Sequence, residues 1–140
     1  MTILDKKNKK IIKNSKVKEY LSDRKLSILS SMKRMNNTYG KFQIIINSKN
    51  EVVGTLTDGD IRRYLIKGKN INESVENCMN RKPQIGKIGE NNKNFSKINK
   101  INIFPAFLPV VKNNKINNII IAFEEVDINS AIIMAGGLGS

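Results

Sequence analysis

VVGTLTDGDIRRYL, residues 52–65, is the stretch of sequence that decides the expected fold of this chain. Its apolar, β-branched first half ends in a hydroxyl, a glycine and two acids, after which the apolar residues take helical spacing. This pattern predicts a strand that enters a helix through a tight polar turn. The turn would gather the Thr57 hydroxyl, the Asp60 carboxylate and the free N–H groups of a helix start, which together can hold a sugar-phosphate. The stretch therefore predicts a nucleotide site.

Thr57 and Asp60 have two interpretations, because they are three residues apart at the expected start of a helix. In one, both side chains face a cleft, where the Asp60 carboxylate accepts from two vicinal ribose hydroxyls. In the other, Thr57 or Asp58 only caps the helix, and the spacing favours neither interpretation. Arg62 and Arg63 could meet ligand phosphates at the mouth of the cleft, although such a pair is more often a solvated helix face.

The composition favours one compact domain, or two small subdomains that share a core. The chain has 140 residues, of which 39% are hydrophobic, and it has no Trp. No apolar run reaches the roughly 18 residues of a membrane span, and none follows the Lys-rich start as in a signal peptide, so we expect a cytoplasmic protein. With no His and Cys78 as the single cysteine, the sequence predicts no metal site, no disulfide and an inert, packed thiol.

A formal net charge of +13 raises the possibility of nucleic-acid binding. The lysines are spread over every segment, however, and their one cluster near the start of the chain contains no interleaved aromatic residue. No helix-turn-helix, zinc-finger or RNA-binding motif follows it. We therefore expect residues 1–20 to form a solvated basic arm or a loose helix, and we expect no nucleic-acid partner. The cluster consists of Lys6, Lys7, Lys9, Lys10, Lys13, Lys16 and Lys18.

The residues around the deciding stretch complete one structural unit. Ser22 is a suitable cap for a helix whose apolar residues continue to Met35. A hairpin with a polar turn and two further helices follow, and Pro83 ends the unit. The expected bounds are 42–46 and 52–57 for the strands, 47–50 for the turn, and 58–68 and 72–79 for the helices.

The second half of the chain repeats this order at a spacing of about sixty residues, counted between the two hairpin turns. An extended piece, a weak amphipathic helix and a second hairpin are expected. The repeat indicates two copies of one small module that pack as a pair. The expected bounds are 84–85 for the extended piece, 90–100 for the helix, 107–111 and 116–123 for the strands, and 112–115 for the turn.

The chain ends with an apolar run and a glycine loop, AIIMAGGLGS at residues 131–140. Gly136, Gly137 and Gly139 would let the backbone approach a phosphate closely, although the Lys-Ser/Thr of a P-loop is absent. A glycine loop at a chain end cannot close over a substrate. We therefore expect the chain to be cut from a longer protein.

GTLTDGDIRR, residues 54–63, strongly resembles the signature of cystathionine-β-synthase (CBS) domains, which work in tandem pairs called Bateman modules. Its Asp-Gly-Asp-Ile-Arg-Arg form is similar to the pair that is fused ahead of sugar-phosphate nucleotidyltransferases. Residues 133–140 are similar to the opening of the nucleotide-binding loop in that transferase domain. The resemblance covers the chain from about residue 22 to residue 140, and the two motifs occur in the order that the family shows.

The resemblance implies an α+β fold of two β-α-β-β-α units related by a pseudo-twofold axis. Adenosine-type ligands would bind in the clefts between the units. The second unit has no Thr-x-x-Asp after Ile121, so we expect one occupied cleft at most. Thr57 and Asp60 would hold ribose and phosphate, and the expected ligand-binding set is Thr57, Asp60, Asp58, Gly54 and Arg63. The expected parts are the arm at 1–20, CBS units at 21–82 and 83–127, the second one incomplete, and the start of a transferase domain at 128–140.

The function implied by the resemblance is regulatory. The module would bind an adenine nucleotide such as AMP, ADP or ATP and control the attached C-terminal transferase. This fragment would have no catalytic residues and no cofactor of its own, whereas the full-length enzyme would use Mg²⁺ to join a nucleoside triphosphate to a sugar 1-phosphate. The alternative is a dimerisation module of the same enzyme that binds no ligand, since tandem modules of this kind commonly form homodimers. A third hypothesis, which ranks below these two, is nucleic-acid binding through the lysine cluster at residues 6–18.

Overall fold

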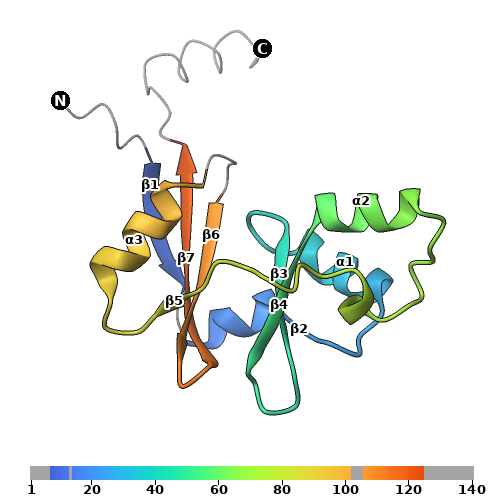
Figure 1. Ribbon diagram of the computed structural model, residues 1–140, viewed down its shortest axis with the longest axis horizontal. Helices are drawn as coiled ribbons and strands as arrows, with labels where there is room; N and C mark the ends of the chain where they lie inside the picture. Colours follow the sequence, from blue (N-terminus) through green and yellow to red (C-terminus); the bar gives the residue numbers. More distant parts are fainter. Residues whose placement is uncertain (1–6, 13, 102–105, 125–140) are drawn as a thin grey trace, which may run out of the picture.

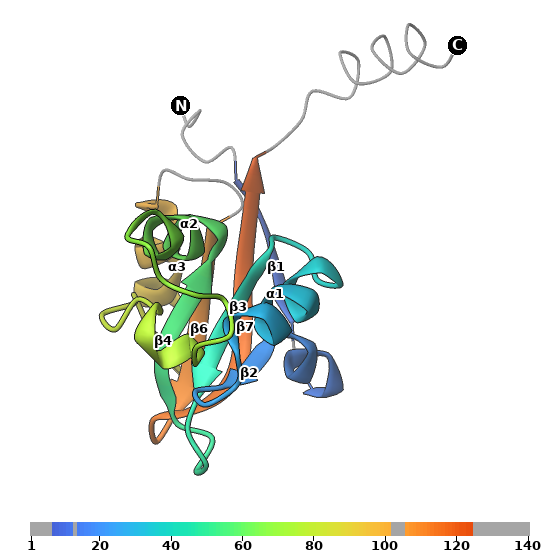
Figure 2. The same ribbon diagram turned by 90° about the vertical axis from the view of Figure 1, so that its right-hand side faces the viewer.

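The computed structural model describes residues 7–12, 14–101 and 106–124, which form two β-sheets packed against each other (Figure 1). The first sheet has the strand order β2-β3-β4 and the second β1-β7-β6-β5. Helices α1 and α2 lie on one outer side and α3 on the other (Figures 1 and 2). The strands are β1 (Lys7–Ile12), β2 (Leu21–Asp23), β3 (Phe42–Ile46), β4 (Val52–Thr57), β5 (Gly86–Lys87), β6 (Ala106–Lys112) and β7 (Lys115–Glu124). The helices are α1 (Ile28–Asn36), α2 (Asp58–Ile66) and α3 (Asn91–Asn99), with 3-10 helices η1 (Asn14–Tyr20) and η2 (Val75–Asn77).

The first unit has the hairpin that the sequence predicts. β3 and β4 pair antiparallel, with Phe42 opposite Thr57, and β2 pairs parallel with β3. Asn50 adopts a left-handed φ of 64° in the turn, where asparagine is one of the few non-glycine residues that tolerates this conformation. Most residues of β4 are buried, and the strand leads directly into α2. The pairing therefore places Thr57 at the end of a fixed strand.

The expected cap of the first helix is wrong. Ser27 caps α1, because its hydroxyl accepts the Ser30 N–H at 3.1 Å. Ser22 is instead buried in β2, where its hydroxyl donates to the Gln43 side-chain oxygen at 2.8 Å and bonds the Ser31 hydroxyl at 2.8 Å. A buried amide requires such partners, so the tertiary contact decides the role of Ser22. The helix expected over 72–79 is also shorter than predicted, since only the 3-10 helix η2 forms there.

The second unit repeats the arrangement of the first. β6 and β7 form an antiparallel hairpin, and the short β5 pairs parallel with β6 as β2 does with β3. α3 precedes the hairpin, as predicted, with Ile98 fully buried. Together these elements confirm the α+β fold of two related units. The expectations for residues 125–140, which include Gly136, Gly137 and Gly139, lie outside the described residues.

The N-terminal segment corrects the expectation of a basic arm. β1 pairs antiparallel with β7 along its whole length and so belongs to the sheet of the second unit. The chain then returns through η1, where Val17 and Tyr20 are buried in the core. β7 is ten residues long and can pair on both sides, so β1 covers an edge that would otherwise be open. The sequence analysis did not predict this pairing, because the partner strand is distant in sequence and β1 has a polar composition.

A shared core joins the two units. Phe42 of the first unit stacks on Phe107 of the second, with ring centres 3.9 Å apart and an angle of 3° between the rings. The hairpin turns also meet, because the Val52 N–H donates to the Asn114 carbonyl at 3.1 Å. The units therefore form one body. Within the described part of the chain, no helix combines the length and apolar character that crossing a bilayer requires.

Candidate functional site

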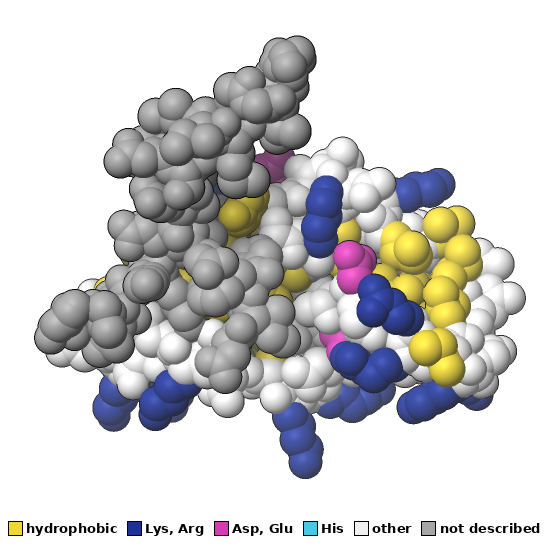
Figure 3. Space-filling view, turned by 90° about the horizontal axis from the view of Figure 1, so that it is seen from above, with side chains coloured by type: hydrophobic (Ala, Val, Ile, Leu, Met, Phe, Trp, Pro, Cys, Tyr) yellow, Lys and Arg dark blue, Asp and Glu magenta, His cyan; other side chains and the backbone are white. Residues whose placement is uncertain are grey.

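A cavity of about 550 Å³ lies between the start of α2 and the second unit. This volume falls within the range of about 300–1,000 Å³ that is typical of small-molecule sites. On the upper face of the molecule, acidic and basic side chains lie side by side next to a group of hydrophobic side chains (Figure 3). The cleft is lined by Gly40, Lys41, Thr55, Thr57, Asp58, Gly59, Asp60, Arg63, Asn80, Pro83, Gln84, Ile101, Ala106 and Phe107.

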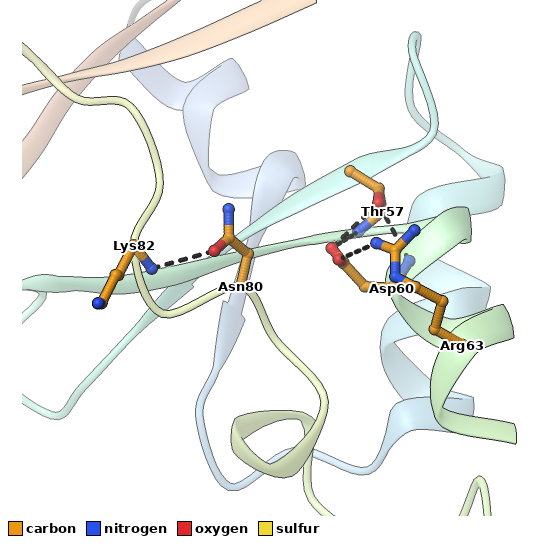
Figure 4. Close-up of polar contacts among 5 residues, drawn as sticks. All are labelled: Thr57, Asp60, Arg63, Asn80 and Lys82. Carbon is orange, nitrogen blue, oxygen red and sulfur yellow. Dashed lines mark hydrogen bonds and ion pairs between the residues drawn. The ribbon is translucent and has the colours of Figure 1, made fainter. Parts of the chain in front are cut away.

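Thr57 and Asp60 form a complete capping box at the start of α2 (Figure 4). The Asp60 N–H donates to the Thr57 hydroxyl oxygen at 3.3 Å, and the Thr57 N–H donates to Asp60 Oδ2 at 2.9 Å. The Thr57 hydroxyl also donates to the same Oδ2 at 3.0 Å. Both residues line the cleft as well, so the two interpretations of their spacing are compatible. The capping bonds hold the carboxylate at one position on the cleft wall.

Arg63 lies over this carboxylate from the next turn of α2 (Figure 4). Its Nη2 donates to Asp60 Oδ1 at 2.7 Å, and the Arg63 side chain is 69% exposed against 12% for Asp60. A Cβ on Gly59 would lie 3.2 Å from Arg63 Nη1, so the glycine leaves room for this approach. The Asp60 carboxylate thus accepts three hydrogen bonds out of about four that it can accept. Arg63 retains further donors for a ligand.

Gly54 has a structural role that differs from the expected ligand contact. A Cβ at this position would lie 2.7 Å from the Asn80 carbonyl oxygen and 2.6 Å from Met79 Sδ. Beside it, the backbone N–H of Thr55 donates to the Asn80 carbonyl at 3.1 Å, and the Asn80 N–H donates to the Thr55 carbonyl at 2.8 Å. Gly54 does not line the cleft itself. Its missing side chain lets Asn80 approach β4 and so join the lining.

The two expected phosphate-binding arginines separate in the structure. Arg63 lines the cleft, whereas Arg62 lines a different hollow on the outer side of α2. Lys41 is a cleft cation that the sequence analysis missed, and its Nζ donates to the Asn36 carbonyl at the end of α1, 3.0 Å away. Gly40 and Lys41 have left-handed φ values of 88° and 53°. In the sequence, the Gly-Lys pair in a short loop before a strand is the feature that could have indicated this cation.

The opposite wall of the cleft is largely apolar and comes from the second unit. Ile101, Ala106 and Phe107 line it, and Pro83 lies in the connection between the units. Sequence reasoning missed these residues, because no local motif marks them and only the pairing of the two units brings them to Thr57. The cleft therefore combines one polar wall, which can bind a sugar-phosphate, with one wall that can contact a flat ring.

Cys78 lies near the site but does not line the cleft. It packs against the core cluster under α1 and α2. Burial raises the pKa of its thiol to about 11, with a smaller contribution from the negative charge of Asp60. The thiolate is therefore scarce at neutral pH, in agreement with an inert, packed cysteine. The described residues contain no group of three or more His, Cys, Asp and Glu side chains that could bind a metal ion.

Solved structures similar to this chain are CBS-domain pairs. CBSX2 in complex with AMP aligns with a TM-score of 0.62 and 15% identity, covering 92% of this chain and 95% of CBSX2. The CBS domains of a transcriptional regulator from Streptococcus pneumoniae align with a TM-score of 0.57 and 19% identity, covering 81% of this chain and 89% of that one. A CBS domain protein from Streptococcus pneumoniae TIGR4 aligns with a TM-score of 0.59 and 12% identity, covering 82% of this chain and 75% of that protein.

The chain has the fold of a CBS-domain pair. At identities of this size the likeness concerns the fold alone. No family model matches the chain. Uncharacterized proteins of Helicobacter pylori strains J99 and 26695 are each 44% identical to it over 41 residues, which make up 29% of this chain and 12% of either relative. The matched segment is thus a small part of those longer proteins.

Proposed function

We propose that this CBS-domain pair is a non-catalytic regulatory module that binds an adenine nucleotide in the cleft between its units. The observation that carries the proposal is the Thr57–Asp60 capping box on the cleft wall, with Arg63 bonded to the same carboxylate. The complex of the similarly folded CBSX2 with AMP supports a ligand of this class. One cleft per chain is proposed to be occupied.

In this proposal the two walls of the cleft bind different parts of the nucleotide. The purine lies against the apolar wall near Phe107, because flat rings bury well against aromatic and aliphatic side chains. One ribose hydroxyl donates to the acceptor position that the three present hydrogen bonds leave open on the Asp60 carboxylate, and the capping bonds hold this carboxylate in place. The free donors of Arg63 face the phosphate, and a guanidinium binds phosphate well through paired N–H groups.

Calorimetric titration with AMP tests the proposal through Asp60→Asn. The substitution preserves size but removes a charged acceptor, so it should weaken AMP binding by about 1.5–3 kcal/mol, the range for a hydrogen bond to a charged group. Asp23→Asn is the matched control, because Asp23 lies outside the cleft and its carboxylate accepts only a local backbone N–H, from Lys25 at 2.8 Å. Absence of AMP binding to the wild type at millimolar concentration rejects the sensing function. An unchanged affinity of Asp60→Asn rejects the assignment of the site.

The target of the regulation is proposed to be a C-terminal sugar-1-phosphate nucleotidyltransferase that would carry the Mg²⁺. This link draws on the similarity of residues 133–140 to a transferase loop, with Gly136, Gly137 and Gly139 as its phosphate-binding glycines. The measurement is pyrophosphate release by the full-length protein from nucleoside triphosphates and sugar 1-phosphates, with and without AMP. A rate that AMP leaves unchanged would remove the regulatory half of the proposal.

Homodimerisation is a second candidate function, favoured by an apolar surface on the outer side of α1 and α2. Leu65 and Ile66 are 38% and 77% exposed there, and they border a hollow with Met32. Exposed apolar side chains that gather on one face often mark an interface. We expect light scattering to give a dimer mass for the chain, and Ile66→Ser to shift it toward the monomer. Lys67→Ser, one residue further along, is the control, and a monomeric wild type would exclude this candidate.

A further inference from the structure

The described lining of the cleft is electrically balanced although the whole protein is strongly basic. Among the described residues that line it, the ionisable ones are Lys41, Asp58, Asp60 and Arg63, two cations and two anions. The chain as a whole carries a formal charge of +13. Charges that lie more than a Debye length away, about 8 Å at physiological ionic strength, are largely screened by salt. The four lining groups lie nearest to a bound phosphate, so they contribute most to the number of phosphate charges that the cleft accepts.

Both cations of the cleft already have partners. Arg63 is paired with Asp60 at 2.7 Å, and Lys41 donates to the Asn36 carbonyl at 3.0 Å. Arg63 has five N–H donors and is well exposed, so it can keep Asp60 and still bind one phosphate group. The one further cation among the described lining residues is Lys41, and it borders a second hollow together with Asp58, whose carboxylate offsets its charge. The donors in the cleft thus suit a single phosphate.

The start of α2 supplies no further positive charge for a second phosphate. A helix N-terminus attracts anions through its free N–H groups and its dipole. Here Asp58 and Asp60 already occupy the first turn, so their negative charges offset the positive end of the dipole. Asp60 is paired with Arg63, whereas Asp58 adds a further anion to the cleft lining. An additional phosphate near this end would meet a carboxylate.

We infer that the cleft selects nucleoside monophosphates over di- and triphosphates, with Asp58 as the residue that discriminates against the additional phosphates. This inference rests on the proposed nucleotide-binding function and specifies its ligand class. The physical reason is that each phosphate beyond the first brings negative charge toward the Asp58 carboxylate without gaining a cation whose charge is unmatched.

Calorimetry with AMP, ADP and ATP tests the inference in metal-free buffer at 150 mM salt. We expect ATP to bind at least about tenfold more weakly than AMP, with ADP between them. Asp58→Asn removes the anion at almost unchanged size, so the ratio of AMP to ATP affinity should fall toward one. Glu90→Gln is the matched control, because Glu90 also stands at the start of a helix but does not line the cleft, and it should leave the ratio unchanged.

The outcomes separate the inference from the function on which it rests. If no adenine nucleotide binds, the proposed function fails and the inference fails with it. If AMP binds but ATP binds as tightly or more tightly, only the selectivity is overturned. If the wild type discriminates but Asp58→Asn keeps the full ratio, or Glu90→Gln lowers it equally, the assignment of selectivity to Asp58 is overturned. A collapsed ratio in Asp58→Asn alone supports the inference.

Discussion

At the scale of single residues, two positions of the signature hold the backbone in place around the cleft. Thr57 holds the start of α2, and its hydroxyl both accepts from the Asp60 N–H and donates to the Asp60 carboxylate. Gly54 leaves the space that Asn80 occupies beside β4. A signature of this kind therefore encodes the wall of a cleft together with the contacts that keep this wall in place.

Gly54→Ala should destabilise the fold because the added methyl group has no space. It would lie 2.7 Å from the Asn80 carbonyl oxygen, which is backbone and cannot turn away as the Met79 side chain can. We expect urea unfolding to show a loss of about 1–3 kcal/mol, the usual cost of overpacking. Gly59→Ala is the control, because the closest atom to a Cβ there is the flexible end of Arg63 at 3.2 Å, and no backbone atom is among its nearest contacts. Equal stability of Gly54→Ala and wild type would contradict this role.

At the scale of elements, local patterns predicted most of the structure but not its long-range pairings. The hairpin at Phe42–Ile46 and Val52–Thr57 and the helix at Asp58–Ile66 follow from alternation, turn residues and capping signals in adjacent sequence. β1 could not be predicted in this way, since its lysine-rich composition resembles a loose arm and its partner β7 lies at the other end of the described chain. Sequence separation conceals such a contact.

The same limit explains the errors at the caps and in the cleft. Ser22 and Ser27 both precede apolar residues, and the tertiary structure decides between them, because Ser22 is buried against Gln43 whereas Ser27 caps the helix. In the cleft, Thr57 and Asp60 stand in one local motif, whereas Phe107 joins them only after the units have packed. Local chemistry therefore predicted the polar wall, and the apolar wall required the tertiary structure.

At the scale of the whole molecule, the Phe42–Phe107 stack links the formation of the cleft to the packing of the two units. Phe42 is almost fully buried in the shared core, and Phe107 both stacks on it and lines the cleft. Because one unit alone would leave this core exposed, we expect the chain to unfold in urea as a single cooperative transition. Two separate transitions would show that the units fold independently.

A double-mutant cycle measures this link between the units directly. Phe42→Leu and Phe107→Leu each remove one ring of the stack, so the double variant should lose less stability than the sum of the single variants. The expected coupling is about 0.5–1.5 kcal/mol, the range for aromatic pairs. Phe107→Leu with Met35→Leu is the control, because Met35 lies in a different core cluster and the two effects should add. Additive losses for Phe42 and Phe107 would show that the stacked rings do not couple the two units, and that the cleft depends on other contacts.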